Sequence, residues 1–214
     1  MDRVQRNGGT SGIITAICLA LLFVLFISSG LDPQAAQDPA KALPIIAQKP
    51  GLFGAIGVLG ALASGFGLVF TIGLFARLRD RAPTRAAAAL GLAFVGLTAH
   101  ALGASLLSQG GQFLVGVSTK DQTAAGHAWI AVTAVAQALN GLGNAFTGAS
   151  ILVAGWAVVA TGAMSTVLGW IAVVGGVVQL LQYFTAAPPL MGIGFLLAIV
   201  WLAWAGIELR RSPA

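Results

Sequence analysis

Charged residues are scarce in this chain of 214 residues, and their scarcity excludes an ordinary water-soluble domain. Only 8% of the residues are charged, whereas 57% are hydrophobic. A soluble domain carries about a quarter charged residues, because water must solvate its surface. We therefore expect lipid to surround much of this protein, and the length allows a single domain, residues 1–214.

Further absences exclude several kinds of chemistry. The one cysteine, Cys18, has no partner for an internal disulfide. The motifs of zinc proteases, serine hydrolases and P-loop NTPases are missing. No apolar run holds a lysine or carboxylate in its interior, so neither ion-coupled transport nor a retinal Schiff base is indicated. Zinc needs three or four ligands close together, and the chain offers two histidines and one cysteine that is distant from them. We expect no enzyme and no metal site.

Long apolar runs are abundant instead, and six of them are long enough to cross a bilayer. A hydrocarbon core about 30 Å thick needs about 20 residues of helix. The runs predict an all-α bundle of six transmembrane helices, at residues 12–31, 52–76, 86–108, 127–161, 166–184 and 190–209. The first run has flanks like those of a signal peptide, but we expect it to be retained as a membrane helix.

The positions of the basic residues predict the orientation of this bundle. Six spans place eight arginines on one side of the membrane: Arg3, Arg6, Arg77, Arg79, Arg81, Arg85, Arg210 and Arg211. The three lysines, Lys41, Lys49 and Lys120, fall on the other side. Because basic residues favour the cytoplasmic side, we expect both termini in the cytoplasm and a location in a bacterial inner membrane. Seven spans, the alternative, would put Arg210 and Arg211 outside.

Two further features agree with this orientation. Four tryptophans fall near the predicted cytoplasmic helix ends and suggest an interfacial belt: Trp156, Trp170, Trp201 and Trp204. The net charge of +5 is explained by orientation, so no nucleic-acid partner is expected. Arg77, Arg79, Arg81 and Arg85 form the densest basic patch; they either orient the chain or bind anionic lipid headgroups.

The fourth run is longer than one upright span requires. Its 35 residues would reach about 52 Å as one helix, more than a bilayer needs. We interpret it as a single helix that begins in the outer interface, with Gly141 as the site of any kink. It also carries a stripe of polar residues spaced by four, three, four and three: Thr133, Gln137, Asn140, Asn144 and Thr147. At about 100° per residue these side chains share one face, and amides facing hydrocarbon are costly.

Other polar residues are predicted at the same depth, in the outer half of the membrane. The second run has a face of small and polar residues, Gly60, Ser64, Gly67 and Thr71, that we expect to pack inward. The predicted cluster between the third, fourth and fifth helices contains His100, Gln137, Asn140, Asn144, Gln179, Gln182 and Tyr183. Such a cluster either holds the helices together by hydrogen bonds or lines a ligand-binding cavity.

His100 allows a further hypothesis. The small residues Gly96, Gly103 and Ala104 beside it would leave room for a haem or chlorophyll macrocycle, with His127 as a conceivable second ligand. The alternative is a histidine hydrogen-bonded to a neighbouring helix. No other cofactor is expected. An absorption spectrum of the purified protein tests whether a tetrapyrrole is bound.

Some short motifs resemble those of uncharacterised bacterial six-helix membrane proteins of the domain-of-unknown-function kind. They are Ala154-Gly155-Trp156, Leu168-Gly169-Trp170 with Gly175-Gly176, and Phe75-Ala76-Arg77-Leu78-Arg79. The resemblance implies an architecture and no established activity.

Three functions are consistent with these features. The first is a non-catalytic accessory or scaffold subunit that packs against another membrane protein or a second copy of itself. The second is a protein that binds or transports a small molecule or lipid through the outer polar cluster. The third is a tetrapyrrole-binding subunit that uses His100.

Overall fold

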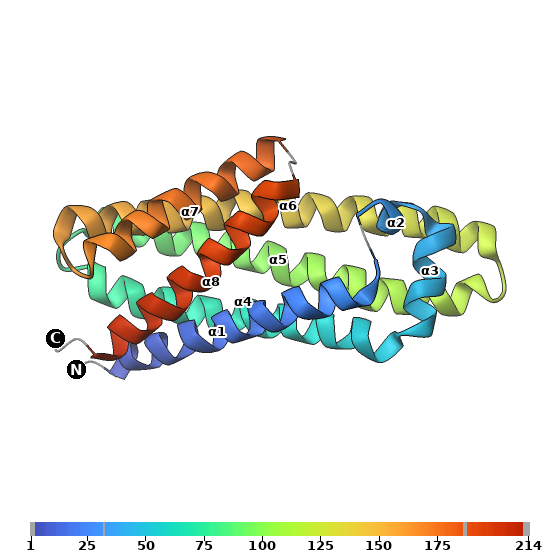
Figure 1. Cartoon of the computed structure of the whole chain (residues 1–214), viewed down its shortest axis with the longest axis horizontal. Coiled ribbons are helices and arrows are strands. Elements are labelled where there is room, and N and C mark those ends of the chain that lie inside the picture. Colours follow the sequence, from blue (N-terminus) through green and yellow to red (C-terminus); the bar gives the residue numbers. More distant parts are fainter. Residues whose placement is uncertain (1–2, 32, 186–187, 212–214) are drawn as a thin grey trace.

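The computed structural model describes residues 3–31, 33–185 and 188–211, and every regular element in them is a helix (Figure 1). In chain order the helices are α1 (Arg3–Ser29), α2 (Pro33–Gln37), α3 (Pro39–Gln48), α4 (Pro50–Leu78), α5 (Pro83–Ser118), α6 (Gln122–Thr161), α7 (Thr166–Thr185) and α8 (Pro188–Arg211). Six of these helices are long and apolar enough to cross a membrane, namely α1, α4, α5, α6, α7 and α8. The predicted all-α fold with six candidate spans is therefore confirmed.

Local sequence explains where these helices begin and end. Five of the eight begin at a proline, whose fixed φ and missing N–H suit the first helical position. Asp38 and Asp121 cap α3 and α6, because their carboxylates accept hydrogen bonds from the N–H groups of Ala40 (3.0 Å) and Ala124 (2.9 Å). Gly162 ends α6 with a φ of +61°, which a residue with a side chain rarely adopts.

The six long helices form a closed ring in chain order. Each packs against the next, from α1 on α4 through to α7 on α8, and α8 then packs against α1. Contacts across the ring are sparse among the described residues. In Figure 1, α1 and α8 meet near the two chain termini and diverge toward the other end. The ring therefore encloses a space between the helices.

Glycines allow the closest helix contacts in the ring. A Cβ added to Gly8 would lie 2.6 Å from the Cα of Gly73, where α1 meets α4. A Cβ added to Gly9 would lie 2.5 Å from the carbonyl oxygen of Gly206, where α1 meets α8. Helices in lipid associate through close packing of small residues, so these glycines fix α1 between its two neighbours.

An apolar cluster fills each end of the ring. One contains Leu74, Leu78, Val158, Leu168 and Trp201 and joins α4, α6, α7 and α8. The other contains Ile46, Phe53, Leu114, Ala125 and Trp129 and joins α3 to α4, α5 and α6. The indole N–H of Trp129 also donates to the carbonyl of Ala36 (2.9 Å), which ties α2 to α6.

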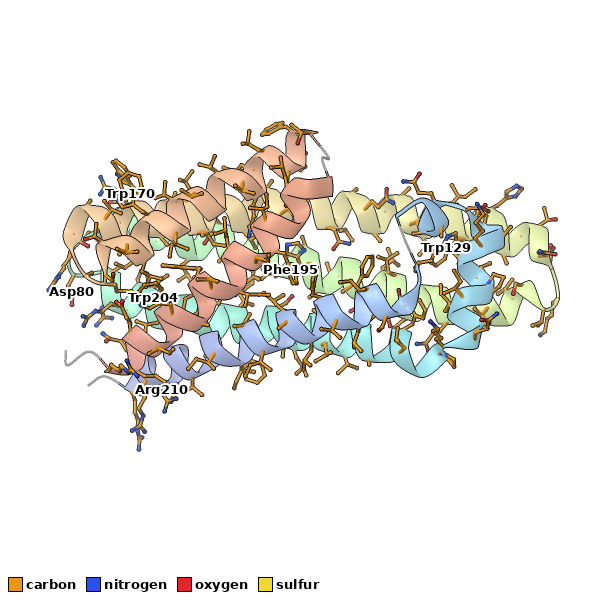
Figure 2. The ribbon with its side chains drawn as sticks, in the orientation of Figure 1. Asp80, Trp129, Trp170, Phe195, Trp204 and Arg210 are labelled. Atoms are coloured by element: carbon orange, nitrogen blue, oxygen red, sulfur yellow. The ribbon has the colours of Figure 1, made fainter. Side chains whose placement is uncertain are left out.

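Basic residues gather at one end, which we call the arginine-rich end. The N- and C-termini and the α4–α5 and α6–α7 turns all lie there, and Figure 2 places Asp80 and Arg210 at it and Trp129 toward the opposite end. Arg77 Nε donates to the carbonyl of Ala163 (3.1 Å). The backbone N–H of Ser165 donates to Glu208 Oε2 (2.9 Å). These two bonds tie the α6–α7 turn to α4 and α8.

The four tryptophans of the predicted belt differ in exposure. Trp156, Trp170 and Trp204 are 48%, 49% and 39% exposed, as residues at a membrane interface should be. Trp201 is only 1% exposed, so its assignment to the belt was wrong. It packs edge-to-face on Phe70 inside the ring, with ring centroids 6.4 Å apart.

The helices on the opposite side are longer than predicted. The sequence predicted a loop at residues 109–126, but α5 continues to Ser118 and α6 begins at Gln122. Glycines and polar residues lower the hydropathy there, yet α2 and α3 pack against this extension and support its helical structure. The predicted loop at residues 31–51 likewise contains α2 and α3. α6 is one continuous helix of 40 residues, about 60 Å long, and is not interrupted at Gly141.

Candidate functional site: a polar cavity inside the helix ring

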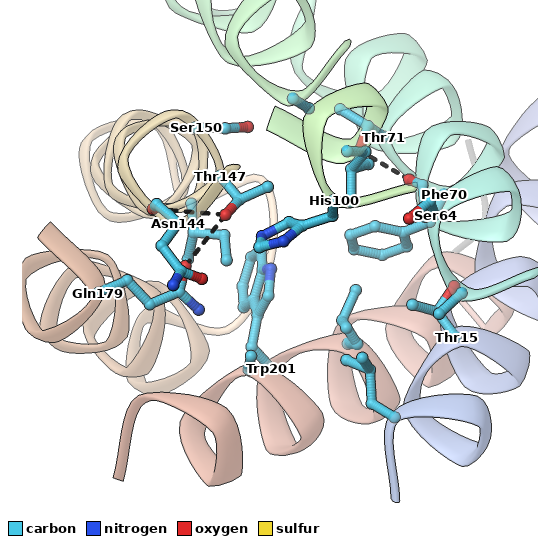
Figure 3. Close-up of a pocket in the computed structure, with 18 of the residues that line it drawn as sticks. Thr15, Ser64, Phe70, Thr71, His100, Asn144, Thr147, Ser150, Gln179 and Trp201 are labelled. Carbon is cyan, nitrogen blue, oxygen red and sulfur yellow. Dashed lines mark hydrogen bonds between the residues drawn. The ribbon is translucent and has the colours of Figure 1, made fainter. Parts of the chain in front are cut away.

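A cavity of about 280 Å³ lies inside the ring, between the two apolar clusters. All six long helices contribute residues to its wall, including Thr15 of α1, Ser64 of α4 and His100 of α5. Figure 3 shows these side chains facing a common space. Its volume is just below the usual range of small-molecule sites, about 300–1,000 Å³.

Glycines of α5 and α6 position His100 on the cavity wall. A Cβ added to Gly143 would lie 2.8 Å from three atoms of the His100 ring, so the imidazole rests against the α6 backbone. A Cβ added to Gly103 would meet Asn140 Oδ1 at 2.5 Å. His100 and Asn140 both line the cavity. The contact between α5 and α6 thus places an imidazole and an amide side by side.

The neighbouring wall, where α6 meets α7, carries more amides. The hydroxyl of Thr147 donates to the Gly143 carbonyl (2.7 Å) and lies 3.4 Å from Gln179 Oε1, and Gln179 is only 8% exposed. Gly148 makes this contact close, since a Cβ added there would lie 2.9 Å from the Gln179 Cβ. Asn144 and Gln182 line the same part of the cavity.

Hydroxyl groups line the facing wall, formed by α1 and α4. Thr15, Ser64 and Thr71 donate to carbonyls one turn earlier in their own helices, at 2.9, 3.0 and 2.9 Å. Their protons are thus used within the helix, while their oxygens keep lone pairs that accept hydrogen bonds. Figure 3 shows these three residues on the side opposite Asn144, Thr147 and Gln179.

The amides have more hydrogen-bonding capacity than the protein uses. Each amide offers two N–H donors and an acceptor oxygen. Within the part of the chain that the structure describes, the Gln179 amide has a polar contact with Thr147, and no side-chain hydrogen bond is found for Asn140, Asn144 and Gln182. Buried polar groups are almost always paired with protein, water or a ligand. The cavity is therefore suited to hold polar guest atoms.

The described lining contains no acidic side chain, lysine or arginine. Apolar residues such as Leu19, Leu97 and Phe195 separate the polar groups. A charged guest would lose its hydration without gaining a counter-ion, which is costly. The arrangement therefore suits an uncharged molecule with both a hydrogen-bonding group and an apolar part.

The structure brings together most of the predicted cluster. His100, Asn140, Asn144, Gln179 and Gln182 all line the cavity, as do the four small and polar residues predicted to face inward from the second span. Phe70 and Trp201 also line it, but sequence patterns did not indicate them. Thr15 was missed as well, although a lone hydroxyl in an apolar run was a usable signal.

Two predicted members, Gln137 and Tyr183, lie outside the described lining. Both side chains are exposed, and Tyr183 contacts Phe184 edge-to-face at 5.2 Å. Ala136 and Thr133 are the buried residues at that level of α6. The even spacing of the five-residue polar stripe did not show that only its last three residues, Asn140, Asn144 and Thr147, line the cavity.

The two histidines lie in different places. His127 is exposed and precedes Gly143, the contact of His100, by sixteen residues of one helix, or about 24 Å. One iron cannot bridge that distance, so a bis-histidine haem does not fit this geometry. A tetrapyrrole bound through His100 alone stays a prediction.

The four arginines of the basic patch make different contacts. Arg77 and Arg81 donate to the carbonyls of Ala163 and Thr161, at 3.1 and 3.5 Å, near the end of α6. A cation is favourable there because the helix dipole places partial negative charge at a C-terminus. Arg79 lies 3.6 Å from Asp80, and Arg85 is exposed. Half of this patch is thus bonded to the neighbouring turn.

Together, the ring and its cavity define the class of this molecule: a polytopic helical membrane protein with a polar cavity between its spans. The chain belongs to the family described as Domain of unknown function (DUF4386), whose model matches residues 10–207. This match includes most of every long helix and confirms the predicted resemblance. The comparisons with curated proteins and with solved structures give no match.

Proposed function

We propose that this protein binds a small, uncharged amphiphile in the cavity inside its helix ring. The observation that supports the proposal is the gathering of four amides and an imidazole with few bonds to each other. The alternative role, in which hydrogen bonds hold the helices together, needs polar groups that pair across an interface. These side chains instead line a space of about 280 Å³, which suits binding better than packing.

An accessory or scaffold role is less well supported. Apolar side chains are exposed on all six long helices, for example Ile17, Val58, Phe94, Ile130, Val174 and Leu196. Lipid alone covers such faces in a membrane protein. Binding of another subunit would not require a polar cavity, so we place the function in the cavity.

The proposal also includes the orientation of the protein in the membrane. We propose that the arginine-rich end faces the cytoplasm, because basic residues are retained on that side of a membrane. Both termini would then be cytoplasmic, as the sequence predicted. Arg79 and Arg85, exposed at that end, are suited to contact anionic lipid headgroups.

Equilibrium binding of octanamide to the purified protein tests the proposed function. Octanoate is the matched probe, because it has the same chain length with a charged head. We expect octanamide to raise the melting temperature and octanoate to have no such effect. Asn144→Leu and Gln179→Leu should each weaken octanamide binding about tenfold, as expected for the loss of one or two hydrogen bonds.

Gln137→Leu is the control variant. It replaces an exposed amide of the same helix, outside the described lining, and should leave octanamide binding unchanged. Equal effects of all three variants, or no binding by the unsubstituted protein, would reject the proposed function.

A further inference from the structure

The two ends of the cavity are closed by packed apolar residues. Toward the arginine-rich end, Trp201, Phe70 and Leu74 belong to one apolar cluster. Toward the opposite end, α2 and α3 pack over α4, α5 and α6 and form the second cluster with them. A guest molecule therefore has no open path along the axis of the ring.

The seam between α1 and α8 is different, because it widens along its length. Near the termini the backbones touch: a Cβ added to Gly9 would lie 2.5 Å from the Gly206 oxygen, and one added to Gly12 would lie 3.0 Å from the Leu202 oxygen. Farther along, α1 and α8 diverge (Figure 1). There Phe23 of α1 stacks on Phe195 of α8, with ring centroids 5.6 Å apart.

The Phe23–Phe195 pair connects the cavity wall to the outer surface of the ring. Phe195, Leu19 and Leu22 line the cavity, whereas Phe23 is 39% exposed and does not belong to the described lining. Phe195 lies in the first half of α8 (Figure 2). Two side chains, and not two backbones, close the seam at this point. Side-chain rotamers change in picoseconds to nanoseconds when exposed, so this closure opens far more easily than a packed helix contact.

The surface outside the pair is apolar. Val24 and Ile27 of α1 are 60% and 65% exposed, and Leu196 of α8 is 55% exposed. All three belong to candidate membrane spans. The seam thus faces hydrocarbon and not water.

We infer that the ligand is a lipid-borne molecule with one alkyl chain and a neutral hydrogen-bonding head, such as a primary amide, and that it enters from the bilayer between α1 and α8, past Phe23 and Phe195. This inference rests on the proposed function and adds the ligand class and the route. The cavity has a volume of about 280 Å³. A head and a few methylene groups fill it, and the rest of the chain lies along the seam.

Dibromostearamide in lipid vesicles is the probe for this route. Its bromine atoms quench indole fluorescence on contact, and Trp201 lies on the cavity wall. Proteoliposomes are mixed with vesicles that contain the probe, and the quenching is followed in time. We expect a component of the quenching that saturates and that disappears in the Trp201→Phe variant. Dibromostearate, with its charged head, should not produce it.

Phe23→Ala tests the seam itself. Phe23 does not line the cavity and can contact only the part of the alkyl chain in the seam, so removal of its ring should change the barrier more than the bound state. We expect uptake and release both to quicken by at least about threefold, with a smaller change in the equilibrium affinity. Phe94→Ala is the control, because Phe94 is a 61% exposed phenylalanine of α5, away from the seam.

The outcomes separate this inference from the proposed function. If octanamide binds from water but dibromostearamide gives no saturable quenching, the lipid-borne ligand is rejected and the binding cavity stands. If Phe23→Ala and Phe94→Ala have equal rates, the route between α1 and α8 is rejected. If neither octanamide nor dibromostearamide binds, the proposed function itself fails.

Discussion

The imidazole of His100 rests directly against Gly143, at a point where α5 and α6 leave no room for a methyl group. A Cβ added to Gly143 would lie 2.8 Å from Cγ, Nδ1 and Cε1 of the ring. This contact fixes the position of the imidazole on the cavity wall and the spacing of the two longest helices.

Substitution of Gly143 should therefore be harmful. Gly143→Ala would force the ring or the helix to move, and overpacking of this kind costs about 1–3 kcal/mol. We expect a lower melting temperature and weaker octanamide binding, measured by thermal unfolding and by titration. Gly91→Ala is the control, because Gly91 is an exposed glycine of α5 with nothing within 4 Å of an added Cβ. An equal effect of both substitutions would contradict the contact.

A second prediction concerns Ser150, which links α6 to α5. Its hydroxyl donates to the carbonyl of Ala89 at 2.7 Å, in a buried position. Hydrogen bonds between membrane helices contribute about 0.6 kcal/mol on average, so Ser150→Ala should lower the free energy of unfolding by about that amount. Unfolding in mixed micelles measures it. Ser28→Ala, which removes an exposed bond within α1 to Leu25, should have a smaller effect; a larger one would refute the prediction.

Glu208 provides a third prediction, since it holds the α6–α7 turn. Its Oε2 accepts from the backbone N–H of Ser165 at 2.9 Å. A hydrogen bond to a charged group contributes about 1.5–3 kcal/mol. Glu208→Ala should therefore lower the free energy of unfolding by about that range, and Glu208→Gln, which keeps an acceptor oxygen, by less. Chemical unfolding curves of the two variants check the order, and a reversed order would contradict the bond.

The orientation gives a fourth prediction, tested with single cysteines in a Cys18→Ala background. Lys120→Cys lies in the α5–α6 turn, and Asp80→Cys lies at the arginine-rich end. In intact cells, a maleimide that cannot cross the membrane should label Lys120→Cys only. After lysis it should label both variants. Labelling of Asp80→Cys alone in intact cells would reverse the proposed orientation.

Much of the fold was predictable, because lipid imposes a simple requirement. Each crossing segment must satisfy its own backbone and be apolar for about 20 residues. Hydropathy therefore located the six spans, and the spacing of Asn140 and Asn144 placed both on one face. The same logic failed at residues 109–126, since polar residues there end the membrane segment but not the helix.

The site was predictable only in part. Periodicity placed Gln137 with Asn140, but it contains no information on how far α7 and α8 extend beside α6. Trp201 was assigned to the interface by its sequence position, whereas the crossing of α8 over the ring buries it against Phe70. Phe23 and Phe195 had no signal, because two phenylalanines in apolar runs look like any lipid-facing residues.

By itself, then, the sequence determined that lipid surrounds the protein, which class of fold it has, where the six spans lie and which polar residues, for the most part, face inward. These properties depend on single segments and on their free energy of transfer into lipid. Only the tertiary structure decided that α8 returns to α1 and closes a ring, that the polar residues surround a cavity, and that two phenylalanines stack across the seam between α1 and α8. Those features depend on contacts between distant segments, where a missing Cβ at Gly9, Gly143 or Gly206 sets how closely two helices approach.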